Sequence, residues 1–216
     1  MQNAGRGKKT YHRQDLKQEL LDTALVLLRE KGIKGFSLRE LASRTGVSHA
    51  APYRHFAGKD ALLAELMLEG HRRLATALNA ARQGVSGSAA ERLIALGKAY
   101  LDFAGKNPEH LSIMFSALGM SAAFALTHPP SVASPSEYDS FGPLEMTVRE
   151  CQAEGSLDPM QSAEALAMAI WAQVHGLSLL RNEGIIGAMS RMRGGDEGQT
   201  IKTIFAILAA QYGKWK

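Results

Sequence analysis

The sequence predicts an all-α protein, and three observations lead to that class. Apolar residues recur at helical spacing, as in the series Leu63, Leu66, Met67, Gly70, Leu74. No segment shows sustained two-residue alternation bounded by Asn-Gly or Asp-Gly turns, the usual signal of a strand. Helix starts are marked by capping residues at several places. We therefore expect about nine helices, with a small N-terminal helix-turn-helix unit followed by a larger helical bundle.

Four helix starts carry a chemical signal. Ser37 with Glu40, and Ser88 with Glu91, have the Ser-x-x-Glu form of a capping box, in which side chains satisfy unpaired backbone N–H groups. The pairs Asn107-Pro108 and Asp158-Pro159 place a capping side chain before a proline suited to the first helical position. The predicted helices are 15–31, 37–45, 48–56, 59–82, 88–105, 107–126, 142–154, 158–182 and 198–213. Segments 128–143 and 190–198, rich in proline or glycine, are predicted loops.

Composition narrows the class of protein. The chain has 216 residues and 23.3 kDa, is 45% hydrophobic and 21% charged, and so has enough apolar material for a sizeable core. Cys151 is the single cysteine, which excludes an intrachain disulfide and a multi-cysteine metal site. The uncharged stretch 111–127 is too short and too polar to span a bilayer, and the basic segment 1–13 precedes no apolar secretory core. We expect a cytoplasmic protein without a membrane partner.

Positive charge is concentrated at the N-terminal end. Residues 1–60 hold 12 Lys and Arg against 6 Asp and Glu, a net charge of +6, whereas residues 61–216 hold 13 against 15, a net charge of −2. The two parts sum to the overall +4. This asymmetry favours an acidic polymer as the partner of the N-terminal part.

Residues 37–56 have the pattern of a helix-turn-helix. Gly46 permits the left-handed turn between the two short helices, and Ser48 can cap the second one. On the second helix, Pro52 and Phe56 are four residues apart and are predicted to face the core. His49 and Tyr53 then project from another face, small at its start and polar thereafter, which suits approach to a DNA major groove. The predicted DNA-binding residues are Ser37, Arg39, Arg44, Ser48, His49, Ala50, Tyr53, Arg54, His55 and Lys59.

The run Phe36 to Leu62 resembles the N-terminal domain of the tetracycline-repressor (TetR) family of transcriptional regulators. That family's Tyr-x-His-Phe sequence stands here as Tyr53-Arg54-His55-Phe56, and its lysine on the following helix as Lys59. The resemblance implies a DNA-binding domain over residues 13–60 and a ligand-binding, dimerising domain over residues 61–216. It also implies a homodimer that pairs through helices 158–182 and 198–213 and binds a pseudo-palindromic operator.

Two shorter motifs resemble a C-terminal domain type of this family named for its Trp-His-Gly residues. They are the segment Ile170 to Leu177, which contains Trp171 and His175, and the segment Asn107 to Phe115. Trp171 and His175 lie four residues apart on one helix face, so both can point into a shared cavity or pack as ordinary core residues. The candidate residues for binding a small apolar effector are Phe103, Met114, Phe115, Phe124, Trp171 and His175.

Two other function classes compete with a ligand-released repressor. An enzyme using the C-terminal cavity lacks support, because no activating motif accompanies Cys151 and His175, and no metal pattern or phosphate loop is present. We therefore expect no catalytic residue, metal or cofactor. A non-specific basic DNA-binding protein is the second alternative, and the near-neutral to acidic segment 61–216 argues against it.

Overall fold

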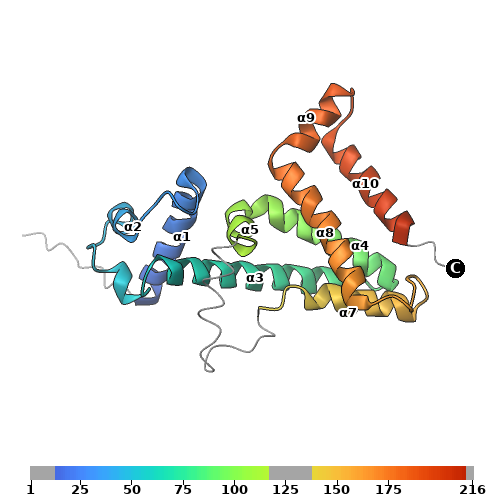
Figure 1. Cartoon of the computed structure of the whole chain (residues 1–216), viewed down its shortest axis with the longest axis horizontal. Coiled ribbons are helices and arrows are strands. Elements are labelled where there is room, and N and C mark those ends of the chain that lie inside the picture. The colour runs from blue at the N-terminus through green and yellow to red at the C-terminus, as the bar shows by residue number, and fades with distance from the viewer. Residues whose placement is uncertain (1–12, 117–137, 213–216) are drawn as a thin grey trace, which may run out of the picture. The chain divides into compact units, whose positions relative to one another are not determined.

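The computed structural model describes residues 13–116 and 138–212, and these residues form nine α-helices, one short 3-10 helix and no strand (Figure 1). The predicted all-α class is confirmed. The described residues divide into two compact units, one of residues 13–67 with 115–116 and the other of residues 68–114 with 138–212. Helix α3 (Lys59–Gln83) contributes residues to both units.

Unit 1 is a small helical domain. It contains α1 (Arg13–Lys31), α2 (Leu38–Thr45), the 3-10 helix η1 (Pro52–Arg54) and the first turns of α3. Its core residues are apolar side chains with almost no exposed surface, each contributing on the order of 1.5–3 kcal/mol by leaving water. They include Leu20, Leu27, Leu41, Phe56, Leu62 and Leu66.

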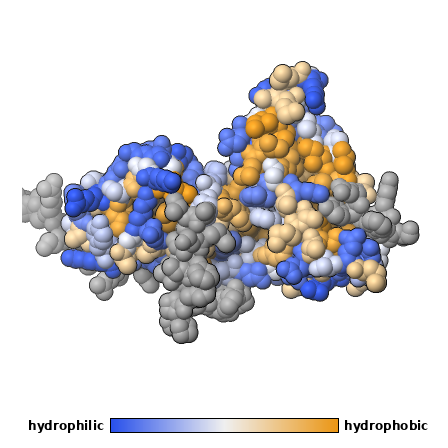
Figure 2. All heavy atoms as spheres, in the orientation of Figure 1, coloured by the Kyte–Doolittle hydropathy of each residue, from blue (hydrophilic) through white to orange (hydrophobic). Residues whose placement is uncertain are grey.

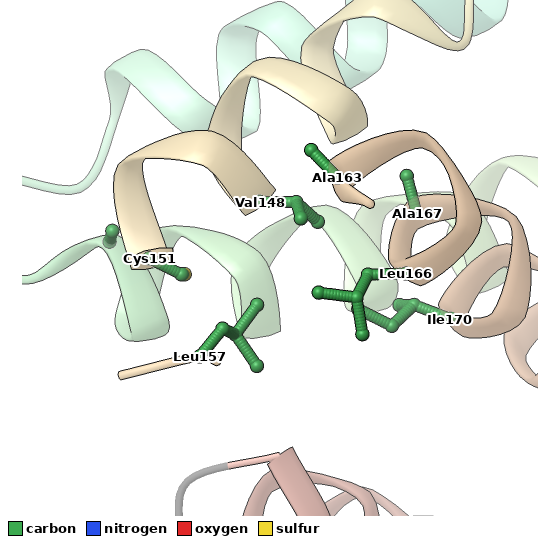
Figure 3. Packing of buried hydrophobic residues seen from close by; sticks show 8 residues of the cluster. Val148, Cys151, Leu157, Ala163, Leu166, Ala167 and Ile170 are labelled. Atoms are coloured by element: carbon green, nitrogen blue, oxygen red, sulfur yellow. The ribbon is translucent and has the colours of Figure 1, made fainter. Parts of the chain in front are cut away.

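Unit 2 holds the remaining helices. They are α4 (Ala89–Lys106), α5 (Pro108–Met114), α7 (Gly142–Ala153), α8 (Ala163–Asn182), α9 (Ile185–Met192) and α10 (Glu197–Tyr212). Helix α4 packs against both α7 and α8, while α9 links α8 to α10 (Figure 1). The core between α4, α7 and α8 consists of Ala89, Val148, Cys151, Leu157, Ala163, Leu166, Ala167 and Ile170 (Figure 3).

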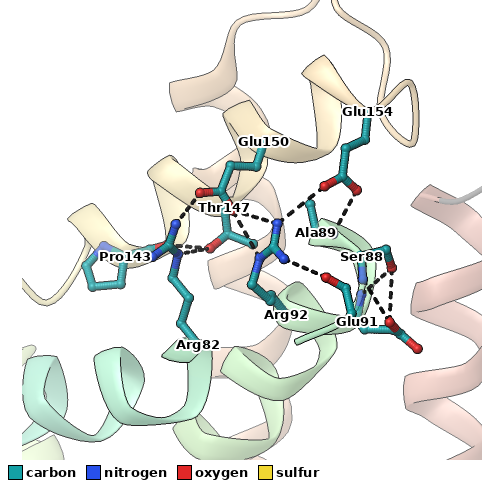
Figure 4. Close-up of polar contacts among 10 residues, drawn as sticks. Arg82, Ser88, Ala89, Glu91, Arg92, Pro143, Thr147, Glu150 and Glu154 are labelled. Atoms are coloured by element: carbon teal, nitrogen blue, oxygen red, sulfur yellow. Dashed lines mark hydrogen bonds and ion pairs between the residues drawn. The ribbon is translucent and has the colours of Figure 1, made fainter. Parts of the chain in front are cut away.

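A polar network fastens α7 to the ends of α3 and α4 (Figure 4). Arg82 of α3 pairs with Glu150 of α7 and donates from Nε to the Thr147 hydroxyl at 3.2 Å. Arg92 of α4 donates from Nε to Glu150 Oε2 at 3.2 Å and pairs with Glu154 at 3.3 Å. These partly buried pairs fix the start of α4 beside α7.

The predicted helix starts have mixed outcomes. Ser88 and Glu91 form the full capping box, since the Ser88 N–H donates to the carboxylate at 2.8 Å and the Glu91 N–H donates to the hydroxyl at 3.3 Å. Ser37 caps α2 by accepting from the Glu40 N–H at 3.2 Å, but the Glu40 carboxylate pairs with Lys31 instead of closing the box. Helix α5 begins at Pro108 as predicted.

Three predicted elements need correction. Segment 48–56 is not an α-helix: after a turn it forms only η1, because Pro52 has no N–H to continue an α-helical ladder. Helix 158–182 starts at Ala163, since Asp158 accepts from the Met160 N–H at 2.9 Å in a local turn while Ser162 is the true N-cap. The predicted loop 190–198 is too long at both ends. Its first residues belong to α9, which ends at Met192, and its last residues belong to α10, which starts at Glu197.

Two boundaries have a limited test. The predicted helix 107–126 is shorter than expected, because α5 ends at Met114 and residues 115–116 form a turn and a bend; residues 117–137 lie outside the described residues. Phe124 and most of the predicted loop 128–143 lie there too. Asn107 was predicted to cap the helix that follows it. Its side-chain amide instead donates to the Phe103 carbonyl at 3.0 Å, at the end of α4.

Candidate functional site

The connection between α2 and η1 is a tight left-handed turn. Gly46 has φ +74°, and the N–H groups of Gly46 and Val47 return to carbonyls of the last turn of α2. The Val47 N–H donates to the Ala42 carbonyl at 3.0 Å. This arrangement is the helix end that a glycine favours, so the predicted role of Gly46 is confirmed.

After this turn the chain presents a short run of side chains to solvent. Backbone bonds from Ala51 to the Ser48 carbonyl (2.9 Å) and from Arg54 to the Ala51 carbonyl (3.1 Å) set consecutive turns rather than an α-helix. Pro52 and Phe56 are buried, as predicted from their spacing. The side chains of Ser48, His49, Ala50, Tyr53 and Arg54 are exposed.

Tyr53 and Arg54 form the centre of this exposed run. Tyr53 is 53% exposed, which is unusual for an aromatic residue in a packed unit. Arg54 lies at the end of η1 and has no ion pair or side-chain hydrogen bond among the described residues. His55 is half-buried, with its ring 6.3 Å from the Phe56 ring.

The predicted DNA-binding residues on α2 differ in how their side chains are occupied. Arg39 is exposed, with no ion pair in the part of the chain that the structure describes. Arg44 donates two hydrogen bonds to Glu30 of α1, at 2.7 and 2.6 Å, and this pair holds the pKa of the Glu30 carboxyl below its usual value. Ser37 is occupied as the N-cap. Sequence reasoning missed Glu30, whose partner is distant along the chain.

Lys59 stabilises the start of α3 rather than pointing freely into solvent. Its ammonium donates to the Phe36 carbonyl at 2.7 Å and lies 4.3 Å from the centre of the Phe36 ring. Burial lowers the pKa of Lys59 from its usual value. His49 likewise has a local neighbour, with Nε2 3.3 Å from the Ser43 hydroxyl.

The predicted effector residues of unit 2 include one connected group. Trp171 and His175 of α8 stack with ring centres 5.0 Å apart, and the Tyr100 hydroxyl of α4 lies 2.7 Å from His175 Nδ1. Burial raises the pKa of Tyr100 to about 12 and lowers that of His175. Sequence reasoning missed Tyr100, because its link to His175 spans two helices.

The other described effector candidates lie on α4 and at the end of α5. Phe103 and Met114 are buried and Phe115 is half-buried. Cys151 is buried in the core between α4, α7 and α8, and burial raises the pKa of its thiol to about 11. A thiol held neutral in this way is a poor nucleophile.

Helix α8 carries an exposed apolar face. Met168, Leu179 and Leu180 are each more than 40% exposed, and Ile207 on α10 is 60% exposed. Apolar atoms gather over this part of unit 2 in Figure 2. By length and composition alone α8 could cross a membrane, and 33% of its most apolar window is buried. Exposed apolar faces of this kind commonly mark a surface that contacts another protein or lipid.

Comparison with known proteins identifies the family. The description "Bacterial regulatory proteins, tetR family" matches residues 20–66, and "Tetracyclin repressor-like, C-terminal domain" matches residues 93–197. The chain belongs to the TetR family. This is a family of regulatory proteins and not of enzymes. The Trp-His-Gly subtype stays a prediction.

Individual relatives agree with this membership. An HTH-type transcriptional regulator of Mycobacterium bovis is 27% identical over 112 residues, which are 51% of this chain and 48% of that protein. The chain thus matches about half the length of its curated relatives. The HTH-type transcriptional regulator AcrR of Shigella flexneri is 40% identical over 53 residues, 24% of this chain and 25% of that protein.

Solved structures share the fold over a longer span. A protein with unknown function from Rhodococcus sp. RHA1 has a TM-score of 0.72 and 28% identity, covering 96% of this chain and 100% of that one. The fatty acid degradation regulator FadR from Bacillus halodurans has a TM-score of 0.68 at 14% identity, covering 94% and 97%. At that identity the likeness shows the TetR fold alone.

Proposed function

We propose that this TetR-family protein is a sequence-specific DNA-binding transcriptional regulator of the cytoplasm, acting as a homodimeric repressor released from its operator by a small, largely apolar effector. The observation that carries the proposal is the exposed run after Gly46. There Tyr53 and Arg54, the latter without an ion pair among the described residues, are exposed to solvent, while Pro52 and Phe56 anchor the same turn in the core. An exposed arginine can donate two hydrogen bonds to a guanine edge or bind phosphate.

The ten DNA-binding candidates divide into two roles under this proposal. Residues with uncommitted side chains would contact DNA directly, with Arg39 and Arg54 supplying charge. Arg44 and Lys59 would act mainly by fixing α2 and α3, since Glu30 and the Phe36 carbonyl already occupy them. Ser37 would also act by fixing α2, since its side chain caps that helix. The other proposed DNA contacts are Ser48, His49, Ala50, Tyr53 and His55.

Dimerisation is supported by the exposed faces of α8 and α10. The exposed residues of α8 include a stripe of small or apolar side chains, and α10 exposes a shorter one. The stripe on α8 consists of Ala165, Met168, Ala169, Ala172 and Leu179, and that on α10 of Ala206, Ile207 and Ala210. Two copies that bury these faces would form a four-helix interface with two-fold symmetry. Such a dimer presents two copies of the exposed run to a pseudo-palindromic site.

Effector binding is supported by the linked Tyr100, Trp171 and His175 side chains. Together they offer aromatic surface and a hydroxyl within one helical bundle, a combination typical of sites for mostly apolar ligands. Phe103, Met114 and Phe115 stay predicted contacts of the apolar part of the effector.

Fluorescence anisotropy on the DNA that flanks the protein's own coding region tests the proposal. Full-length protein would be titrated at two salt concentrations with excess unrelated duplex as competitor. Tight binding that resists the competitor is the expected result. Binding that disappears with competitor, together with no enriched sequence in a genome-wide selection, would favour the alternative of a non-specific basic DNA-binding protein.

A further inference from the structure

Two buried polar atoms face each other where α3 and α5 meet in unit 2. Glu69 Oε2 on α3 lies 3.9 Å from His110 Nε2 on α5. The His110 side chain is 3% exposed and the Glu69 side chain 12%. Neither atom has a hydrogen-bond partner among the described residues.

This pairing is incomplete by ordinary standards. Direct hydrogen bonds between such atoms are about 2.7–3.2 Å long, so the two groups attract each other without bonding. Buried polar atoms in folded proteins nearly always have a partner. The other Glu69 oxygen pairs with Arg73 one turn along α3. The neighbouring His110 imidazole, and then Arg73, lower the pKa of Glu69 to about 2 against the effect of burial, so the carboxylate is charged.

The surroundings of the pair are tight and apolar. A Cβ added at Gly70 would lie 2.6 Å from Met114 Sδ and 3.3 Å from His110 Cβ, so α5 packs directly on the backbone of α3. Ile113 and Met114 of the same helix have no exposed surface. The two polar atoms thus lie beside an apolar contact between α3 and α5, with Arg73 on the other oxygen of Glu69.

We propose that Glu69 and His110 are the polar anchor of the effector site, and that the effector carries a hydrogen-bond-donating head group without negative charge on an apolar body. This inference rests on the proposed function. A carboxylate only accepts hydrogen bonds, and an imidazole nitrogen can accept or donate, so an ammonium or hydroxyl group satisfies both atoms. An anionic head group would be repelled by the negative charge of the Glu69 carboxylate.

The place of Glu69 on α3 connects head-group binding to regulation. Unit 1 ends at Met67 and Glu69 is the second residue of unit 2 on the same helix. A ligand that binds one arrangement of α3 more tightly than another shifts the population toward it. Under the proposed function, a head group that engages Glu69 and favours the DNA-released arrangement of α3 therefore weakens operator binding.

Hexylamine, 1-hexanol and hexanoate test this assignment, because they share one chain and differ in the head group. Thermal melting of the full-length protein with each probe at millimolar concentration reports binding. We expect hexylamine and hexanol to raise the melting temperature and hexanoate to leave it unchanged. In Glu69→Gln the response to hexylamine falls at least tenfold in apparent affinity. Glu145→Gln is the matched control, since Glu145 forms the same i,i+4 pair with Arg149 on the surface.

Each outcome decides the assignment. Equal shifts with hexanoate, no shift with any probe, or an unchanged ranking of head groups in Glu69→Gln overturns it and makes the pair a structural contact. If Glu69→Gln does not fold, His110→Asn replaces it and is expected to weaken binding of hexanol. Operator binding without probe is measured in parallel by anisotropy. Intact operator binding with no probe response refutes only this inference, whereas absent operator binding refutes the proposed function.

Discussion

Arg44 and Arg54 are both exposed arginines of unit 1, but among the described residues only Arg44 has an acidic partner, Glu30. We expect Arg54→Ala to weaken operator binding by about 1–3 kcal/mol if the side chain reads a base. Arg44→Ala should cost less, because its charge is matched before DNA arrives. Anisotropy titrations of both variants on the same operator measure the difference. An equal loss in the two variants would contradict the division of roles proposed for these residues.

Glu30→Gln tests the same idea from the acidic side. Removing the Glu30 carboxylate frees the Arg44 guanidinium, which is bound there through two hydrogen bonds. We expect tighter DNA binding and a salt dependence steeper by up to about one phosphate contact. The logarithm of affinity against the logarithm of salt concentration gives this slope. A slope identical to that of the unmodified protein would mean that Arg44 does not face DNA.

Glu69 makes stability depend on pH in a defined direction. Its folded-state pKa of about 2 lies below the ordinary value of 4.5, so its contribution is complete above pH 4.5 and is lost as the pH falls toward 2. Each unit by which the folded-state pKa lies below the unfolded-state pKa corresponds to about 1.4 kcal/mol of folding free energy, so the full contribution of Glu69 is up to about 3 kcal/mol. Urea unfolding between pH 7 and pH 3 should show a shallower loss in Glu69→Gln. Glu145→Gln, whose carboxylate is more exposed, should keep the slope of the unmodified protein.

At single positions, the sequence predicted which side chains are buried or exposed better than it predicted their hydrogen-bond partners. Pro52 and Phe56 are buried and Tyr53 exposed as predicted, although the segment is not an α-helix, because the Phe56 N–H donates to the Pro52 carbonyl at 2.9 Å and this one helical turn keeps both residues on the core side. The partners Glu30 for Arg44 and Tyr100 for His175 come from other helices. Sequence separation does not encode such contacts, so these pairs could be found only after the helices were packed.

At the scale of single elements, Gly46 ends α2 in a left-handed conformation, and its replacement should cost stability through the backbone alone. An added Cβ would have no atom within 4 Å, so no clash contributes. We expect Gly46→Ala to lower the free energy of unfolding by about 1–2 kcal/mol because φ is +74°. Gly58→Ala is the matched control: the space is equally open and φ is not positive. Equal unfolding midpoints in urea for the two variants would contradict this explanation.

Element boundaries were predictable where a local chemical signal decided them. The Ser88 capping box lies where the sequence placed it, since both partners are within one turn. Segment 48–56 was overestimated because the apolar spacing of Pro52 and Phe56 suits a helix while the missing N–H of Pro52 does not. Helix α9 was missed because the glycines near residue 194 outweighed a short amphipathic segment. In both cases two local signals conflicted, and periodicity could not rank them.

For the whole molecule, the exposed apolar faces of α8 and α10 are the main property that the single chain leaves unsatisfied. A soluble chain rarely keeps such a large apolar surface in water, which favours an oligomer or a lipid contact. Membership of a family of bacterial regulatory proteins favours the oligomer. The alanine and glycine residues within the α8 face, such as Ala169, Ala172 and Gly176, would let a second helix approach closely.

Met168→Glu is therefore expected to disrupt assembly. The side chain is 48% exposed on the α8 face, so glutamate is tolerated in the monomer but would bury a charge in a dimer that pairs through this face. Light scattering with size-exclusion chromatography should give the monomer mass for the variant and the proposed dimer mass for the unmodified chain at the same concentration. Operator affinity should fall because the two half-sites are no longer bound together. Met160→Glu is the control, since Met160 is 90% exposed and precedes α8. A Met168→Glu protein that keeps both its mass and its operator affinity would place the dimer interface elsewhere and leave the α8 face to another partner.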